Sequence, residues 1–294
     1  MLFSVVIATK DRAALLRAAL ESLAEQKDAP PFETIVADNG SRDETPSVVE
    51  ELSGRVPYPL RRIEAGNANR ALARNTGIAE ARGELVLFID DDVWLPSHFL
   101  AAHAGAQKNG SRRAVTGPIV NVSSHTERPR PSAANFSNAF FCTCNASVAR
   151  AVLEEVGGFD EAFDLYGWED TELGLRLREA GVEHTFAWDA FLYHIKPPEP
   201  LDVAVQRTLE KATMAARLVR KNRTLRARLA TGAYGLNLLR GRFVAPLLPL
   251  YAGVAGSARL PKGLVAYARA RLIDGLYVAR LARELKRENL NRPA

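Results

Sequence analysis

The residues best suited to chemistry are carboxylates that directly follow apolar runs. Asp38 follows the run TIVA. Asp90, Asp91 and Asp92 follow the run LVLFI. Side chains alternate along extended backbone, so Asp90 and Asp92 can converge on one cation while Asp91 faces elsewhere. Since hard carboxylate oxygens suit Mg²⁺ or Mn²⁺, the triplet favours a divalent-cation site. The alternative is a helix cap at Asp92 with two solvated neighbours.

Other chemically capable groups are ambiguous on spacing alone. Glu169 and Asp170 open a predicted helix, where acidic residues are common because the helix dipole stabilises them. His194 ends a predicted strand, where a histidine is usually a polar core or surface residue. Cys142 and Cys144 lack the second pair that would complete a zinc site, so we predict buried thiols.

The elements that must position these groups alternate between strands and helices. β-Branched runs predict strands, and apolar residues at helical spacing predict the helices between them. The predicted strands are Phe3–Ala8, Thr34–Ala37, Leu60–Ile63, Glu84–Ile89 and Ala114–Val120, and the predicted helices are Ala13–Gln26, Thr45–Leu52, Ala68–Ala81 and Pro96–Gln107. The first, second and fourth strands look buried on both faces. This alternation predicts an α/β fold with a mostly parallel sheet flanked by helices, which binds ligands outside the carboxyl ends of its strands.

The second half of the chain contains a predicted loop and a domain boundary. Ser123–Ser137 is polar and proline-containing, as loops are. The elements expected after it are helices over Ser147–Val156 and from about Trp168 to Ala180, and strands over Val182–Ala187 and Phe191–His194. Three prolines within Lys196–Pro200 mark a boundary. We therefore predict one domain over residues 1–200 and a basic helical region over residues 201–294, which begins with a helical stretch at Val203–Ala230.

The charge of the chain is unevenly distributed. The net charge is +5, yet residues 201–294 hold 19 Lys+Arg against 5 Asp+Glu, whereas residues 1–200 hold 20 against 29. A basic region of this kind usually meets phosphate, on a nucleic acid or on an anionic membrane. Its aromatic residues are too sparse for a base-stacking platform: Tyr234, Phe243, Tyr251, Tyr267 and Tyr277. We therefore predict peripheral contact with an anionic membrane and no nucleic-acid partner.

An uncharged segment inside the basic region supports that interpretation. Phe243–Ala258 is a run of sixteen residues without a charge, interrupted by prolines and glycines. A spanning helix needs about 20 apolar residues, so we predict a segment that lies in a membrane surface. A helical hairpin packed on the first domain is the alternative. The N-terminus has no basic flank before its apolar stretch and is not predicted to be a signal peptide. The predicted location is cytoplasmic, with peripheral contact at the cytoplasmic membrane face.

Five segments in series resemble one known family. They are SVVIATKDR, IVADNGSRD, ALARNTGIAEARGELVLFIDDDVWLP, GGFDE and YGWEDTELGLRLREAG. Together they resemble the family-2 glycosyltransferases of the GT-A fold, over roughly residues 1–195. The resemblance implies inverting transfer of a sugar from a nucleotide-diphosphate sugar, with a UDP-sugar favoured, to an acceptor hydroxyl. The implied setting is polysaccharide, glycolipid or other glycoconjugate synthesis, with a sugar or lipid-linked acceptor.

The resemblance also implies which residues bind the donor nucleotide. Thr9, Arg12 and Asp38 match positions that hold the nucleoside, and Arg74 matches one near the nucleotide. A carboxylate at Asp38 is chemically apt because it accepts from the imide N–H of uracil or thymine. Asp91 would lie near the ribose and phosphate.

The same resemblance implies a metal site and a catalytic base. The aspartate triplet resembles the DxD signature, which implies Asp90 and Asp92 as ligands of Mn²⁺ or Mg²⁺. His194 matches a position that some members use as a further ligand, and an imidazole favours Mn²⁺. The base would be Asp170, which takes the proton of the attacking acceptor hydroxyl. The same motif implies that Glu169 and its neighbour Trp168 shape the acceptor side.

Two alternative functions remain open from the sequence. A sugar-phosphate nucleotidyltransferase would need a glycine-rich loop after the first strand, and ATKDRAA contains no glycine. A non-catalytic nucleotide-sugar-binding protein would have a degraded site, yet every expected acid is present. Oligomerisation is also left open.

Overall fold

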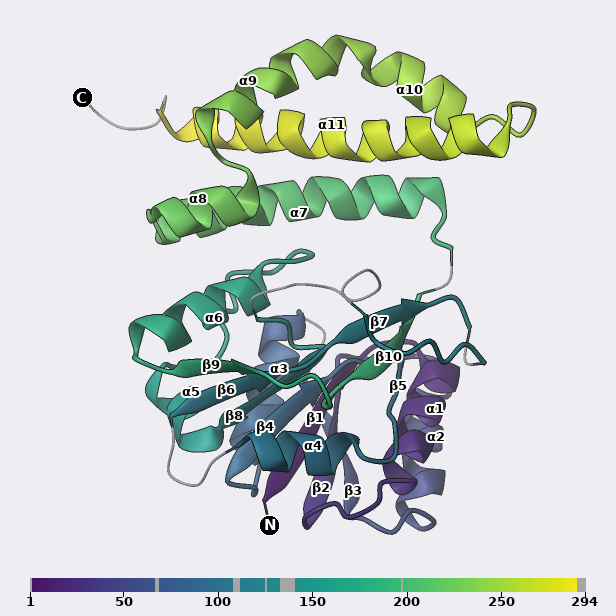
Figure 1. Ribbon diagram of the computed structural model, residues 1–294, viewed down its shortest axis with the longest axis vertical. Coiled ribbons are helices and arrows are strands. Elements are labelled where there is room, and N and C mark those ends of the chain that lie inside the picture. The colour runs from purple at the N-terminus through teal and green to yellow at the C-terminus, as the bar shows by residue number, and fades with distance from the viewer. Residues whose placement is uncertain are drawn as a thin grey trace. The chain divides into compact units, whose positions relative to one another are not determined.

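The computed structural model describes residues 2–66, 69–107, 112–124, 126–132, 141–196 and 198–289. The chain divides into two compact units (Figure 1). The first comprises Met1–Asp164 and Glu169–Pro198, and the second comprises Leu165–Trp168 and Glu199–Ala294. We refer to them as the sheet unit and the helical unit.

The sheet unit is built on a seven-stranded sheet with the order β3-β2-β1-β4-β8-β6-β9. Its strands are β1 (Phe3–Thr9), β2 (Phe32–Asp38), β3 (Leu60–Glu64), β4 (Leu85–Ile89), β6 (Arg113–Thr116), β8 (Asn145–Ala149) and β9 (Glu183–Phe186). Strands β3, β2, β1 and β4 are parallel, and β8 is antiparallel to both of its neighbours. A three-stranded sheet has the order β5-β10-β7, with β5 (Val93–Trp94), β10 (Leu192–Ile195) and β7 (Ile119–Val122).

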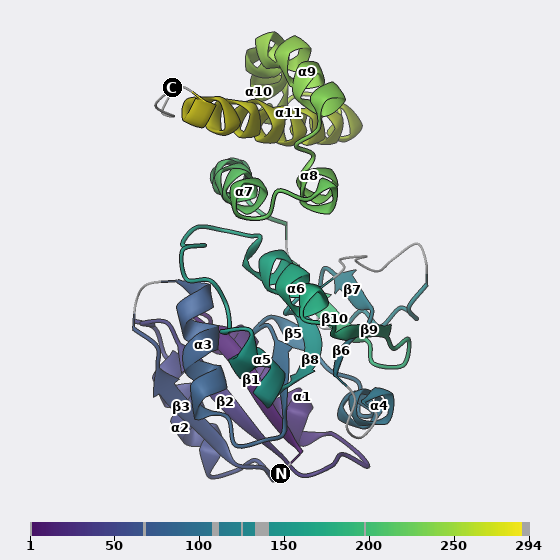
Figure 2. The ribbon, with the colours of Figure 1, turned by 90° about the vertical axis from the view of Figure 1, so that its left-hand side faces the viewer.

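Helices cover both faces of the large sheet because its central strands are apolar on both sides. On β1, Phe3, Val5 and Ile7 pack into one core cluster, whereas Val6 packs into another. The first cluster includes residues of α1 (Ala13–Ala24), α2 (Thr45–Ser53) and α4 (Phe99–Ala106). The second includes residues of α3 (Arg70–Glu80), α5 (Arg150–Glu155) and α6 (Glu169–Glu179). Figure 2 shows α3 and α4 on opposite sides of the strands. The predicted α/β class and the two-sided burial of the first, second and fourth strands are confirmed.

Several predicted elements differ from the structure. The helix predicted over Pro96–Gln107 begins at Phe99. The strand predicted over Ala114–Val120 is two strands, β6 and β7, separated at Gly117, where an added Cβ would lie 1.8 Å from the Ala190 carbonyl oxygen. The helix predicted from Ser147 begins only at Arg150, because residues 147–149 pair with β4 as part of β8. The stretch predicted over residues 203–230 is two helices. Within the loop predicted over residues 123–137, residues 125 and 133–137 lie outside the described residues, as do Ala68 of the third predicted helix and Pro197 of the predicted boundary.

The described residues of the helical unit form six elements. They are α7 (Leu201–Lys221), α8 (Leu225–Thr231), α9 (Gly235–Val244), the 3₁₀ turn η1 (Ala245–Leu247), α10 (Leu248–Ala255) and α11 (Lys262–Asn289). Alanines of α7 pack with Leu281 of α11, while Ala255 of α10 packs with Ala268 and Leu272 of α11. Figure 1 shows α9 and α10 lying along α11. Within the described part of the chain, every helix is too short or too polar to cross a membrane.

Candidate active site

The carboxyl ends of β1 and β4 bring the first candidate residues together. The two strands are parallel neighbours, so the end of β1 at Thr9 lies beside the aspartates that follow β4. The Thr9 hydroxyl donates to Asp91 Oδ2 (2.7 Å), and Asp91 is buried. Arg12 Nη1 lies 2.8 Å from Asp92 Oδ2 and 3.7 Å from Asp91 Oδ1. One arginine thus bridges two adjacent carboxylates.

The small sheet brings His194 to the same carboxylates. On β10, His194 pairs in register with Val93, the residue that follows Asp92. His194 Nε2 lies 3.1 Å from Asp92 Oδ1, and its Nδ1 lies 2.9 Å from Asn121 Oδ1 on β7. Ligand atoms of Asp90, Cys144 and His194 lie within 4.8 Å of one another. Asp90 and Asp92 therefore both lie near His194, while Asp91 contacts Thr9.

These donors fit a hard or borderline divalent cation. Two carboxylates and one imidazole are a ligand set suited to Mn²⁺, and carboxylates alone suit Mg²⁺. Burial, together with the negative charge of Asp90, raises the pKa of the Cys144 thiol. A soft sulfur ligand suits neither Mg²⁺ nor Mn²⁺, so the cysteine is a poor ligand for these two cations. Asn121 is a residue that sequence reasoning missed. It orients His194 through the second ring nitrogen, as partners of metal-binding histidines do, and only the strand register reveals it.

Burial and neighbouring charges separate the acidities of Asp91 and Asp92. Burial raises the pKa of Asp91 to about 7, against the opposing effect of Arg12. Burial also opposes ionisation of Asp92, but hydrogen bonding and charge from His194 and Arg12 lower its pKa overall. The pKa of His194 is raised, because Asp92 outweighs the effect of burial. The carboxylate that contacts His194 is therefore the more readily ionised of the two.

A buried arginine connects Asp90 to the acidic pair that begins α6. Arg74 on α3 is only 6% exposed. Its Nη1 lies 2.9 Å from Glu169 Oε1, its Nη2 lies 3.4 Å from Asp90 Oδ1, and its guanidinium lies over the Phe159 ring. Glu169 Oε2 is buried without a hydrogen-bond partner among the residues that the structure describes. The two terminal guanidinium nitrogens thus each contact a carboxylate of the chain, Glu169 for Nη1 and Asp90 for Nη2.

Asp170 lies at the N-terminus of α6 and is partly exposed. Its Oδ1 accepts a hydrogen bond from the Thr171 backbone N–H (2.6 Å). Burial and the negative charge of Glu169 raise the pKa of Asp170 to about 6, although Arg74 opposes the shift. A carboxylate with a pKa near the working pH is ionised at neutrality and accepts a proton more readily than an ordinary aspartate.

Asp38 and Trp168 lie outside this cluster of direct contacts. Asp38 ends β2 in register with Thr9 and is buried; its oxygens accept from the Ser41 N–H (2.8 Å) and Arg62 Nη1 (3.0 Å). A carboxylate can accept about four hydrogen bonds, so acceptor capacity remains. Trp168 has a left-handed backbone (φ 76°), and its indole N–H donates to the Lys211 carbonyl oxygen within the helical unit (2.9 Å).

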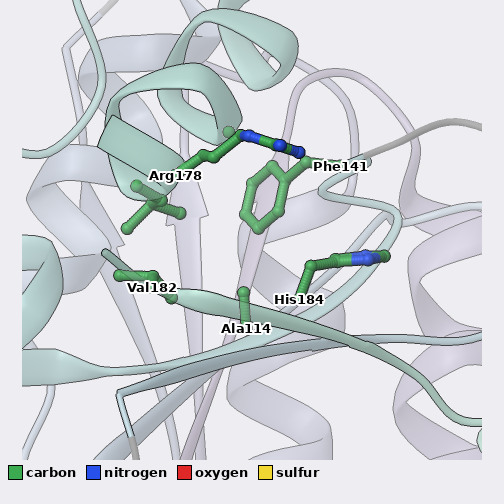
Figure 3. Close-up of a pocket in the computed structure, with 7 residues that line it drawn as sticks. Ala114, Phe141, Arg178, Val182 and His184 are labelled. Carbon is green, nitrogen blue, oxygen red and sulfur yellow. The ribbon is translucent and has the colours of Figure 1, made fainter. Parts of the chain in front are cut away.

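A small pocket between α6 and the strands β6 and β9 is separate from these residues (Figure 3). Its lining includes Phe141, Arg178 and His184, and His184 Nε2 lies 2.8 Å from the Thr116 hydroxyl. A volume of about 10 Å³ leaves room for a single water molecule at most. This pocket therefore cannot hold a sugar or a nucleotide.

Models of known families define the class of protein. The model described as "Glycosyl transferase family 2" matches residues 4–157, and the model described as "N-terminal domain of galactosyltransferase" matches residues 124–197. The chain belongs to glycosyl transferase family 2 and is a glycosyltransferase. This membership favours the predicted enzyme class over the nucleotidyltransferase alternative.

Several curated relatives are similar over about two thirds of the chain. Validoxylamine A glucosyltransferase of Streptomyces hygroscopicus subsp. limoneus is 32% identical over 65% of this chain and 51% of its own length. The uncharacterized glycosyltransferase YfnE of Bacillus subtilis is 27% identical over 66% of this chain and 65% of its own length. Chondroitin synthase of Escherichia coli is 27% identical over 66% of this chain and 35% of its own length. The chain thus spans less than two thirds of the length of each relative.

Two solved structures share the fold. The mannosyltransferase PcManGT from Pyrobaculum calidifontis, in complex with GDP-Man and Mn²⁺, matches with a TM-score of 0.68 and 21% identity, over 97% of this chain and 87% of its own. Residues 1–349 of S. aureus TarS, in complex with UDP-GlcNAc, match with a TM-score of 0.57 and 20% identity, over 98% and 92%. These similarities support the predicted GT-A architecture.

Proposed function

We propose that this glycosyltransferase moves a sugar from a nucleotide-diphosphate sugar to an acceptor hydroxyl, with inversion at the anomeric carbon and with a divalent cation. One observation carries the proposal. Asp90, Asp92 and His194 gather where β4 ends, and a carboxylate of raised pKa, Asp170, is close enough to Asp90 for their charges to interact. This proximity supports the proposal of a cation site and a catalytic base within one site.

The proposed cation ligands are Asp90, Asp92 and His194. When bound there, Mn²⁺ or Mg²⁺ would neutralise charge on the diphosphate leaving group. The imidazole favours Mn²⁺. The presence of Mn²⁺ with a nucleotide sugar in PcManGT, a protein of the same fold, supports the proposal.

The proposed nucleotide contacts are Thr9, Arg12, Asp38 and Asp91. Asp38 retains acceptor capacity for the imide N–H of uracil, which favours UDP. The UDP-GlcNAc complex of TarS supports that preference, whereas the GDP-Man complex of PcManGT supports a guanine donor. We propose that Arg74 positions Asp90 and Glu169 near the nucleotide and does not contact the nucleotide itself. Both groups that contact its guanidinium nitrogens are these carboxylates.

The proposed chemistry is a single displacement. Asp170 removes the proton of the acceptor hydroxyl as the oxygen attacks the anomeric carbon from the face opposite the leaving group. No covalent intermediate forms, so one displacement inverts the configuration. Glu169 and Trp168 are proposed to shape the acceptor side. Arg74 holds Glu169 through a buried ion pair, which keeps one carboxylate beside the base fixed in place.

The wider setting is also part of the proposal. We propose a catalytic domain over residues 1–200 and a basic helical region over residues 201–294, although Leu165–Trp168 group with the helical unit. The acceptor would be a sugar or a lipid-linked sugar at the cytoplasmic face of an anionic membrane. The product would be a polysaccharide, a glycolipid or another glycoconjugate.

A nucleotide panel with and without metal tests the proposed function. UDP, GDP and dTDP are each added to the protein in a thermal-shift assay, with Mn²⁺ or with excess chelator. We expect the midpoint of unfolding to rise with UDP and Mn²⁺ and to rise far less in chelator, because a ligand that binds only the folded state stabilises it. An equal shift in chelator would overturn the metal assignment, and a shift with GDP alone would overturn the preference for UDP.

A further inference from the structure

The segment formed by α9, η1 and α10 has an inner apolar face that packs tightly on α11. A Cβ added at Gly241 would lie 2.5 Å from Val278 Cγ1, and one added at Gly275 would lie 2.6 Å from Leu248 Cδ2. Such close approaches leave no space between the helices. The inner face of the segment therefore packs closely on α11 at these two positions.

The same segment has a second apolar face that points to solvent. Its residues recur every three or four positions, as on one side of a helix: Leu236, Leu239, Phe243, Leu247 and Leu250. Their exposed fractions are 77%, 46%, 72%, 44% and 64%. We call this set the outer stripe. Several large apolar residues aligned on one exposed face mark an interaction surface rather than a random scatter of surface leucines.

Basic residues accompany the outer stripe. Arg242, Arg259 and Lys262 are exposed, and none has an acidic partner among the residues that the structure describes. Arg240 is paired with Asp274. No aspartate or glutamate occurs in the sequence between Glu210 and Asp274. The segment itself is therefore basic and carries no carboxylate, and Asp274 of α11 pairs with only one of its arginines, Arg240.

We propose that the outer stripe inserts into the surface of an anionic bilayer, with Arg242, Arg259 and Lys262 contacting lipid phosphates. This inference rests on the membrane contact of the proposed function and adds the surface that makes it. The described helices are too short or too polar to span a bilayer, so the segment lies in the plane of the interface. A second copy of the chain fits less well, because a symmetric contact would bring two uncompensated basic surfaces together.

Insertion and charge attraction have different signatures. Attraction by arginines and lysines weakens as salt screens it, with a screening length of about 10 Å at 0.1 M. Burial of leucine and phenylalanine side chains does not weaken with salt. The proposal therefore expects two components of membrane binding: one that salt removes, and one that persists in salt and belongs to the outer stripe.

Flotation of the full chain with lipid vesicles separates these components. The probes are vesicles of phosphatidylcholine with and without phosphatidylglycerol, at low and high salt. We expect binding to the anionic vesicles, with part of it surviving high salt. The double variant Phe243→Ser/Leu247→Ser should lose the binding that survives high salt. Its affinity for the anionic vesicles should fall at least about tenfold, because two large apolar side chains are removed. The matched control is Leu165→Ser, a 43%-exposed leucine outside the stripe, which should bind like the wild type.

Four further measurements distinguish the outcomes: circular dichroism, fluorescence quenching, the oligomeric state and the thermal shift. Circular dichroism of the double variant checks that it folds. In the variant Phe243→Trp, brominated lipids should quench the fluorescence of the introduced tryptophan if the stripe enters the bilayer. Equal vesicle binding by the double variant, or no binding by the wild type, would overturn the proposal. The proposal would also be overturned if the wild type were a dimer and the double variant were a monomer. The Mn²⁺-dependent thermal shift with UDP, run on the same samples, reports on the proposed function independently of these outcomes.

Discussion

The two units of the chain use their charged residues in opposite ways. In the sheet unit, Arg74 and Glu169 form a pair whose side chains are each 8% exposed. In the helical unit, Arg242 and Arg259 are exposed and without an acidic partner among the described residues. Buried pairs fix the positions of side chains, because each charge is costly to leave without the other. Exposed arginines without an acidic partner have guanidinium N–H groups that can bind a molecule outside the chain. We therefore expect catalysis near the buried ion pairs of the sheet unit and binding of a partner at the exposed arginines of the helical unit.

The largest expected effect follows from removing one carboxylate of the proposed cation site in the sheet unit. Asp92→Ala deletes the group that both Arg12 and His194 contact. Since Asp92 is a proposed ligand, we expect turnover to fall to background and UDP binding to lose its response to Mn²⁺. Turnover and thermal shift across a Mn²⁺ titration measure the two effects. Asp189→Ala, at an exposed carboxylate of the same unit, is the control and should behave like the wild type.

The second effect isolates the proposed base. Asp170→Asn keeps the shape of the side chain but cannot accept the proton, so turnover should fall by about 10² or more. Donor binding should persist, which the thermal shift with UDP and Mn²⁺ checks. Asp164→Asn, at an exposed aspartate of the sheet unit, controls for loss of charge. Near-normal turnover in Asp170→Asn would place the base elsewhere, with Glu169 as the next candidate.

The third effect compares a buried pair with an exposed pair directly. Arg74→Met leaves Glu169 buried without its partner, and we expect the free energy of unfolding to fall by about 3 kcal/mol. Arg240→Met breaks a pair whose side chains are 42% and 37% exposed, and we expect a loss of about 0.5 kcal/mol. Urea unfolding of the two variants measures both losses. Equal losses would mean that the two units do not differ in how their ion pairs contribute to stability.

The sequence predicted the placement of the site better than its contacts. Parallel strands end at one edge of the sheet, so Thr9, Asp38 and the aspartates after β4 could be located from strand ends alone. The Arg74–Glu169 pair joins residues 95 positions apart, and no local pattern encodes it. The Asn121–His194 contact depends on the register of a second sheet, which pattern reasoning did not separate from the first. The proposed roles of all these residues stay predictions.

The helical unit was harder to predict for a different physical reason. Its exposed and inward faces are both apolar along α9 and α10, so hydrophobic periodicity could not say which face packs. The sequence shows the uncharged run from Phe243, but it does not show that the outer stripe extends upstream through Leu236 and Leu239, beyond the charged residues Arg240 and Arg242. That continuation is visible only when the burial of each turn against α11 is known.

The smallest expected effect is a contrast in pH dependence between the two units. Because the pKa of Asp170 is raised to about 6, its ionised form is lost as the pH falls through 6. At saturating Mn²⁺, kcat/KM should therefore fall about fivefold between pH 6 and pH 5, and the residual activity of Asp170→Asn should lack this decline. Arginine stays protonated throughout, so vesicle binding by the wild type should be flat from pH 5 to pH 8. A pH–rate profile and vesicle flotation in the same buffers measure both. A parallel decline in the two assays would mean that acid affects the fold as a whole rather than the base.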